Sequence, residues 1–159
     1  MTDASFDDGT ENPVRLKAET AEDLQVISTL IQDAVGQNSE TSWLPRHNRF
    51  ALMLNRFRWE DKANATKQNR PFERVQSTLV FEGVQKAGGD GIDPRNQASI
   101  FSVLSVSFDA SNDAAGEVVL VLAGDGAIRL RVEYLEATLT DVSRPYKARA
   151  KSAPAHNPD

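Results

Sequence analysis

The sequence contains no cysteine, and this absence excludes several kinds of site before any pattern is considered. Disulfide bonds, thiolate nucleophiles and sulfur-based zinc sites all need cysteine. Histidine is also scarce: there are only His47, in an expected turn, and His156, near the C-terminal end. Two isolated histidines do not make a typical ligand set for a transition metal. The sequence therefore indicates no metal site and no cofactor.

Long hydrophobic runs are missing as well. The longest apolar stretch, residues 118–123, is the size of a β-strand and falls far short of the ~18–20 residues that cross a bilayer. Residues 1–11 are acidic and lack the basic-then-apolar layout of a secretory signal. These features predict a cytoplasmic protein with no membrane partner.

Catalytic motifs are absent too. No Gly-x-Ser-x-Gly elbow occurs, and the run Gly88-Gly89-Asp90-Gly91 lacks the Lys-Ser/Thr ending of a phosphate-binding loop. The loop carboxylates Asp90, Asp93, Asp109 and Asp113 do not follow the order of a calcium-binding loop. We therefore assign no catalytic residue and expect the protein not to be an enzyme.

The chain that remains has the composition of one ordinary globular domain. It has 159 residues, of which 40% are hydrophobic and 26% charged. Both ends are polar and lack apolar periodicity, so residues 1–12 and 147–159 are expected to be disordered tails. A single α+β domain is predicted over residues 13–146.

One amphipathic helix is predicted near the N-terminal end, after a short strand at residues 14–18. Thr20 can cap its first turn, Glu22 and Asp23 complement the positive end of its dipole, and Gly36 suits the position after its last turn. The apolar positions of this helix fall on one face: Leu24, Ile27, Leu30, Ile31, Ala34 and Val35. The pattern indicates a helix packed against a sheet.

After Trp43 the apolar period changes from helical to the two-residue period of strands. Strands are expected at residues 49–59, 74–84 and 98–108, with a turn at 45–48 and loops at 61–71 and 85–97. A hairpin over 117–134 turns at Gly124-Asp125-Gly126. Residues 135–142 are either a strand that continues past a bulge or a terminal helix, with the threonines at 138 and 140 favouring the strand.

These elements predict a predominantly antiparallel sheet or a partly open barrel, with one N-terminal amphipathic helix packed on it. The order of the elements also permits a barrel similar to the pleckstrin-homology type, by analogy of fold alone.

The charge is unevenly distributed along the chain. The net charge is −5, but residues 46–74 hold eight basic against three acidic side chains, a local net charge of +5. Within this basic segment, Arg56 and Arg58 are expected on one face of a strand, about 7 Å apart, with Phe57 and Trp59 on the other face. Guanidinium groups in a row suit phosphate or carboxylate oxygens.

Six residues follow as candidates for a binding surface: Arg46, Arg49, Arg56, Arg58, Trp43 and Trp59. Exposed aromatic side chains beside arginine make good interface anchors. The opposing interpretation, which we weight more heavily, is that the arginines pair with acidic groups of the same chain, such as those of the helix, or solubilise a sheet edge. Tryptophan is likewise more often a core residue.

Three segments carry a resemblance to a known family: 49–52 (RFAL), 54–60 (LNRFRWE) and 126–130 (GAIRL), the last of which continues into Val132-Glu133 and on to Asp141. Through them the sequence resembles a bacterial family of proteins of unknown function, DUF2948. The resemblance extends over about residues 14–146. It implies a shared fold but brings no catalytic or binding residues with it.

The expected function is a non-enzymatic binding or interaction domain that engages a protein partner or a second copy of itself. One alternative is an anion-binding module, for nucleic acid or a phosphorylated ligand, that uses the basic strand; the net negative charge disfavours nucleic acid but leaves it open. The other alternative is an enzyme whose site the sequence does not reveal.

Overall fold

The computed structural model describes residues 13–69, 71–93 and 95–147, and within them strands outnumber helices. The elements in chain order are β2 (Arg15–Ala18), α2 (Ala21–Leu30), β3 (Val35–Leu44), the 3-10 helix η1 (Pro45–His47), β4 (Arg49–Phe57), the 3-10 helix η2 (Trp59–Asp61), α3 (Lys62–Lys67), β5 (Glu73–Phe81), β6 (Val84–Asp90), β7 (Ile100–Asn112), β8 (Ala115–Leu122), β9 (Gly126–Val132), β10 (Ala137–Asp141) and β11 (Tyr146–Lys147).

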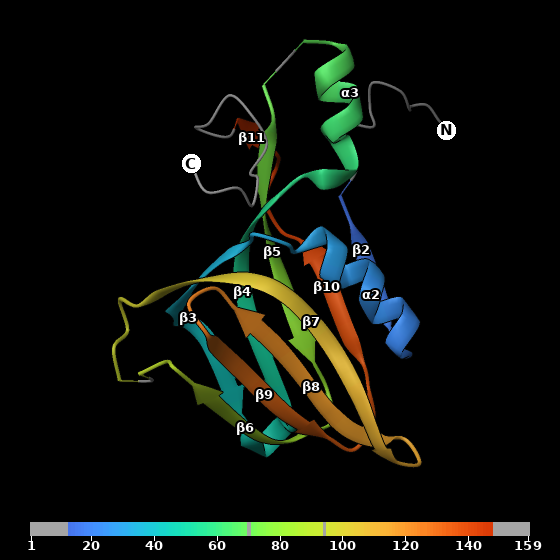
Figure 1. The fold of residues 1–159 in the computed structure, drawn as a ribbon, viewed down its shortest axis with the longest axis vertical. Coiled ribbons are helices and arrows are strands. Elements are labelled where there is room, and N and C mark those ends of the chain that lie inside the picture. The colour runs from blue at the N-terminus through green and yellow to red at the C-terminus, as the bar shows by residue number, and fades with distance from the viewer. Residues whose placement is uncertain (1–12, 70, 94, 148–159) are drawn as a thin grey trace.

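The strands form one antiparallel sheet in the order β2-β10-β5-β4-β3-β7-β8-β9-β6, with β11 paired to β5. The sheet is strongly curved, so that β7, β8 and β9 lie in front of β3, β4 and β5 in Figure 1. The sheet is not closed: in the described part of the chain, β6 pairs with β9 along one edge and no strand pairs with its other edge. The expected antiparallel sheet is confirmed.

The core lies between the two halves of the curved sheet. The inward-facing residues of β4, β5, β8 and β9 are almost wholly inaccessible to solvent, among them Leu52, Leu79, Leu120 and Leu130. Their alternation along each strand is the period of two that the sequence shows. Apolar burial of this kind is the main stabilising contribution to the fold.

Helix α2 packs on β7 and begins as its cap residues predict. The Thr20 hydroxyl accepts from the backbone amide of Asp23 at 3.1 Å, and Leu24 and Ile27 are fully buried. Ser28 joins the helix to the sheet because its hydroxyl accepts from the Val106 amide at 3.0 Å. The helix is not N-terminal, however, because strand β2 precedes it.

The predicted C-terminal end of this helix was wrong. The helix ends at Leu30, and Gly36 lies in β3 rather than after a last helical turn. Gly36 is needed for close packing, because a Cβ atom there would lie 2.4 Å from Cζ of Phe101. The apolar residues Ala34 and Val35 therefore pack with the sheet and not on the helix, although their spacing continues the apolar face of the helix.

Three other sequence expectations were wrong in their boundaries. The strand expected to reach residue 59 ends at Phe57, and the loop expected at 61–71 contains α3, whose one buried residue, Ala65, is too little for an apolar stripe. The glycine-rich segment expected as a loop forms strand β6 as far as Asp90.

Several expectations were confirmed. The turn at 45–48 is η1 followed by Asn48 with φ of 50°, and the hairpin of β8 and β9 turns through Gly124 and Asp125 with positive φ. Residues 137–141 form a strand, β10, which resolves the choice between strand and helix. The tails expected at 1–12 and 147–159 lie outside the described residues, apart from Lys147 in β11.

Candidate functional site

A cavity lies where the curved sheet fails to close, between β6 and β9 on one side and β3 and β4 on the other. We call it the seam cavity. It has a volume of about 330 Å³ and opens to solvent. Its lining consists of Asn38, Thr41, Trp43, Phe50, Ala87, Gly88, Gly89, Ile92, Gln97, Phe101 and Ile128.

The seam exists because β3 and β6 run past each other without pairing. Among the described strands, β3 pairs with β7 only at residues 35–37. It pairs with β4 at residues 35–36 and 41–44, and β6 pairs only with β9. One end of the seam is held by the bond from the Val84 amide to the Asn48 carbonyl, at 2.9 Å. At the other end, the Asn38 amide group donates to the carbonyls of Asp93 and Asn96, both at 3.0 Å.

The lining is mainly apolar and carries no charged side chain. Trp43, Phe50 and Phe101 supply aromatic surface, while Ile92 and Ile128 supply aliphatic surface. The polar lining residues are the uncharged Asn38, Thr41 and Gln97, and the Thr41 hydroxyl donates to the Gln37 carbonyl at 3.1 Å. An apolar pocket of this size with a few polar groups at its edge is typical of small-molecule sites.

A second cavity of about 250 Å³ adjoins the first. It is lined by Gly91, Ile92, Ser99, Ile100, Phe101, Ser102, Leu122, Ala123 and Gly126. Ile92 and Phe101 belong to both linings, so these two side chains lie between the cavities. The second cavity is bordered by serines, glycines and exposed backbone and is therefore the more polar of the two.

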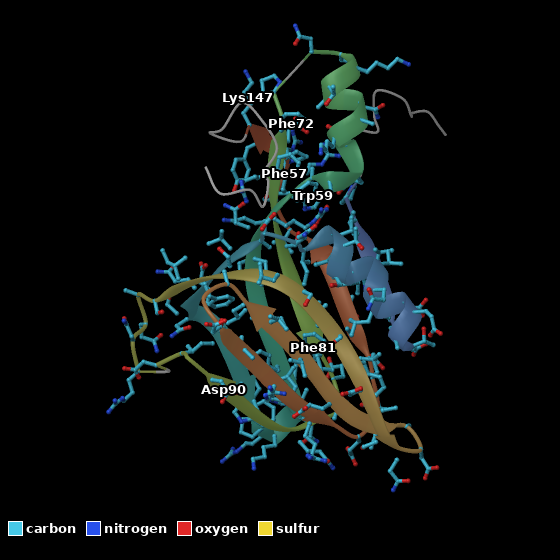
Figure 2. The ribbon with its side chains drawn as sticks, viewed as in Figure 1. Phe57, Trp59, Phe72, Phe81, Asp90 and Lys147 are labelled. Atoms are coloured by element: carbon cyan, nitrogen blue, oxygen red, sulfur yellow. The ribbon has the colours of Figure 1, made fainter. Side chains whose placement is uncertain are left out.

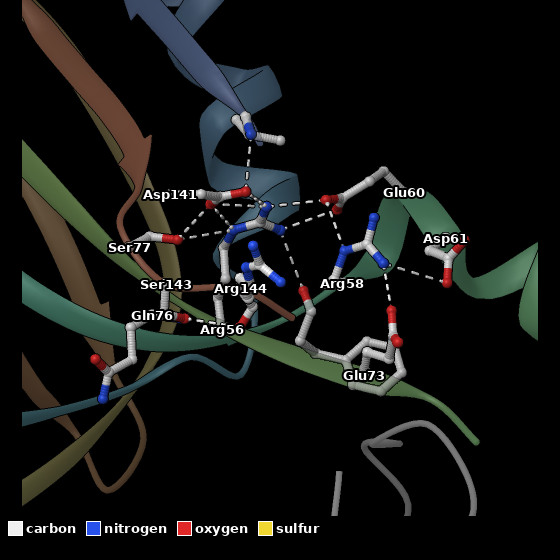
Figure 3. Close-up of polar contacts among 12 residues, drawn as sticks. Arg56, Arg58, Glu60, Asp61, Glu73, Gln76, Ser77, Asp141, Ser143 and Arg144 are labelled. Atoms are coloured by element: carbon white, nitrogen blue, oxygen red, sulfur yellow. Dashed lines mark hydrogen bonds and ion pairs between the residues drawn. The ribbon is translucent and has the colours of Figure 1, made fainter. Parts of the chain in front are cut away.

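The predicted basic row is not an exposed surface. Arg56 is fully buried at the inner end of a polar network (Figure 3). Its Nη2 donates to both carboxylate oxygens of Asp141 at 3.0 Å and to Glu60 at 2.9 Å, and its Nε donates to the Ser77 hydroxyl at 3.1 Å. Asp141 also accepts from Ser77 at 2.6 Å and from the backbone amide of Val14 at 2.8 Å.

The charges of this network stabilise one another. Burial lowers the pKa of Arg56, but the hydrogen bonds and charges of Glu60 and Asp141 outweigh burial and raise that pKa above its ordinary value. Burial likewise raises the pKa of Glu60, and the hydrogen bond and charge of Arg56 outweigh it, so the pKa of Glu60 lies below its ordinary value. The guanidinium of Arg56 is thus permanently charged and already satisfied.

Arg58 lies just beyond β4 and is also buried, with Glu73 and Asp61 as ion partners. Arg58 is therefore not a residue of the strand as expected, although its guanidinium group and that of Arg56 both pair with Glu60. The partners of both arginines come from η2, β5 and β10 and not from the acidic helix.

The two tryptophans have separate environments. Trp59 packs on Phe57 with ring centroids 4.7 Å apart, and its indole nitrogen donates to the Gln32 carbonyl at 3.0 Å. Phe57 also contacts Phe72, at 5.6 Å between centroids, so these rings form one apolar cluster (Figure 2). Trp43, in contrast, lines the seam cavity.

The structure therefore does not bring the six candidate residues together. Arg56, Arg58 and Trp59 belong to internal clusters, Arg49 pairs with Glu82 at 2.9 Å, and Arg46 is exposed on η1. Of the six, Trp43 lines the seam cavity.

Sequence reasoning missed most of the seam cavity because its walls come from distant segments. One signal was available: a glycine pair inside a strand marks a place where a ligand or another backbone approaches closely. Gly88 and Gly89 are such a pair, but they were interpreted as part of a loop.

Two further searches of the described residues concern metals and membranes. No group of three or more histidine, aspartate or glutamate side chains in those ranges is placed to hold a metal ion. No helix in the same part of the chain combines the length and hydropathy of a membrane span.

The fold and cavity define a mainly antiparallel β domain with two short helices and an apolar cavity at its open seam. The chain belongs to the family described as protein of unknown function (DUF2948), whose model matches residues 14–156. No curated protein and no solved structure matches the chain.

Proposed function

We propose that this protein is a non-enzymatic binding domain that takes a small, uncharged and mainly apolar molecule into the seam cavity. The observation that carries the proposal is the lining: three aromatic and two isoleucine side chains surround about 330 Å³ of space with no charged group among them. Removing apolar walls of this kind from contact with water favours binding.

The lining also argues for binding over catalysis. It contains no carboxylate, histidine or lysine to act as a general acid or base. Its one hydroxyl, on Thr41, is engaged with the Gln37 carbonyl. The cavity therefore offers shape and apolar contact, with uncharged polar groups at its edge for orientation.

The glycine pair of β6 supports a role in keeping this space open. Register places Gly89 opposite Ile128 on the inner face and Gly88 opposite Arg129 on the outer face. A Cβ atom at Gly89 would meet its nearest atoms at an ordinary 3.7 Å, and one at Gly88 would meet none within 4 Å. Neither position has the positive φ that requires glycine, although glycine within a strand costs about 0.5–1 kcal/mol. A bound molecule at Gly89 supplies the missing reason.

The same strand provides a matched experiment. Gly89→Leu places a side chain in the seam cavity, whereas Lys86→Leu places the same side chain at an exposed position of β6 outside the cavity lining. The probe is N-phenyl-1-naphthylamine, an uncharged apolar dye that fluoresces out of water. We expect saturable fluorescence with the wild type and Lys86→Leu, and at least a tenfold loss of affinity with Gly89→Leu. Equal binding by all three proteins, or no binding by the wild type, would overturn the proposal.

The other sequence-based expectations stay predictions. These are engagement of a protein partner or a second copy, the pleckstrin-homology likeness, a bacterial source and a cytoplasmic location. Anion binding by the arginines is less favoured, because Arg56 and Arg58 are buried among carboxylates. Exposed Arg46 remains the candidate for such a contact.

A further inference from the structure

The seam cavity and the second cavity meet at two side chains, Ile92 and Phe101. We infer that the ligand is an elongated amphiphile, with an apolar chain in the seam cavity and an uncharged hydrogen-bonding head in the second cavity. Ile92 sets the length of chain that fits. This inference rests on the proposed function and specifies the ligand class.

Of the two side chains between the cavities, Ile92 is the one that can be substituted without disturbing the sheet. Phe101 lies in the middle of the sheet, is 8% exposed, and packs so closely on Gly36 that even a Cβ there would collide with its ring. Ile92 lies two residues after the end of β6, outside any strand, and is half-buried against the core. A change of its side chain therefore alters the passage without disturbing strand pairing.

The second cavity suits a polar head. Ser99 and Ser102 contribute to its walls, and the backbone of Gly91 is exposed there, whereas Gly126 is buried. These two glycines lie against each other, because a Cβ at Gly91 would lie 3.2 Å from Cα of Gly126. The hydroxyl or amide head of a ligand can donate hydrogen bonds to the serine hydroxyls and accept hydrogen bonds from them.

The charges around the second cavity select against an anionic head. Asp90 and Asp125 directly precede the two glycines, and Asp93 follows Ile92. Arg129 pairs with both Asp90, at 3.2 Å, and Glu117, at 3.4 Å, and Arg95 pairs with Asp93 at 3.3 Å. With Asp125, the acidic groups here outnumber the basic groups. No cation lines either cavity to receive a carboxylate. An alcohol or a primary amide therefore fits better than a fatty acid.

The experiment measures competition of straight-chain alcohols against N-phenyl-1-naphthylamine. Each added methylene that enters an apolar site tightens binding about fourfold, until the chain fills the seam cavity, whose volume depends on Ile92, and the gain stops. Ile92→Ala is expected to move this limit to a longer chain, and Ile92→Phe to a shorter one. Val26→Ala, a change on the exposed face of α2, serves as the control and keeps the wild-type limit. The carboxylate of matching length is expected to bind at least tenfold more weakly than the alcohol at pH 7.

The outcomes separate this inference from the proposed function. If the dye does not bind, or binds Gly89→Leu as well as the wild type, the seam cavity is not the site and both fail. If the dye results hold but the chain-length limit is the same in wild type, Ile92→Ala and Ile92→Phe, the amphiphile inference alone is overturned. Preferential binding of the carboxylate would likewise overturn it. Circular dichroism of each variant verifies that it is folded.

Discussion

Removing the carboxylate of Asp141 is expected to destabilise the fold more than any surface charge change. Its side chain is 3% exposed and that of Arg56 is 0% exposed. Asp141→Ala leaves three groups without this acceptor: the guanidinium of Arg56, the hydroxyl of Ser77 and the amide of Val14. These groups belong to β4, β5 and the segment before β2, so one side chain holds together strands that are far apart in sequence.

The expected loss can be worked from these contacts. Breaking a buried ion pair from one side costs about 3–5 kcal/mol, because the remaining charge is left buried and unpaired. Glu60 still binds Arg56 in the variant, which places the loss near the lower end, at about 3 kcal/mol. For a domain of this size, that loss lowers the Tm by on the order of 10 °C.

The assay is equilibrium urea unfolding followed by circular dichroism, with Glu82→Ala as the matched control. Glu82 also pairs with an arginine, Arg49, but the two side chains are 28% and 43% exposed. Exposed pairs contribute less than about 1 kcal/mol. A loss for Asp141→Ala below 1 kcal/mol, or no larger than that for Glu82→Ala, would refute the assigned role of the network.

Two further predictions concern pH and packing. Because the pKa of Glu60 is below its ordinary value of 4.5 in the folded state, its contribution to stability is present above that value and is lost as the pH falls through the folded pKa. Glu60→Gln should therefore flatten the acid side of a stability profile, and an unchanged profile would contradict this. Gly36→Ala should lower the free energy of unfolding by about 1–3 kcal/mol, because the added methyl group overpacks against Phe101. Phe101→Leu should restore part of that loss in the double variant. Equal stability of Gly36→Ala and wild type would count against the close packing.

Local signals predicted local structure well. The start of α2 follows from Thr20 and two acidic residues, and the hairpin of β8 and β9 follows from alternation around a glycine-containing turn. The end of α2 was not predictable in this way, because the spacing of Ala34 and Val35 fits the apolar face of a helix as well as it fits the sheet. Tertiary packing of Gly36 against Phe101 favours the sheet.

The roles of the arginines and of the cavity depend on contacts between distant segments. An alternating strand with Arg56 looks half-solvated in sequence. Its buried partners lie elsewhere in the chain: Ser77 is 21 positions away and Asp141 is 85 positions away. The seam cavity similarly depends on where β3 stops pairing with β7 and on the curvature that brings β6 opposite β3. Neither feature has a signature in a short stretch of sequence.

The most direct test of the seam cavity as the binding site is a map of chemical-shift changes in the isotope-labelled protein on titration with N-phenyl-1-naphthylamine. The account predicts that the largest changes occur at Gly89, Phe101, Ile128 and the indole of Trp43, all of which line the cavity. Changes centred on Arg46 and Arg49, or spread evenly over the surface, would contradict it.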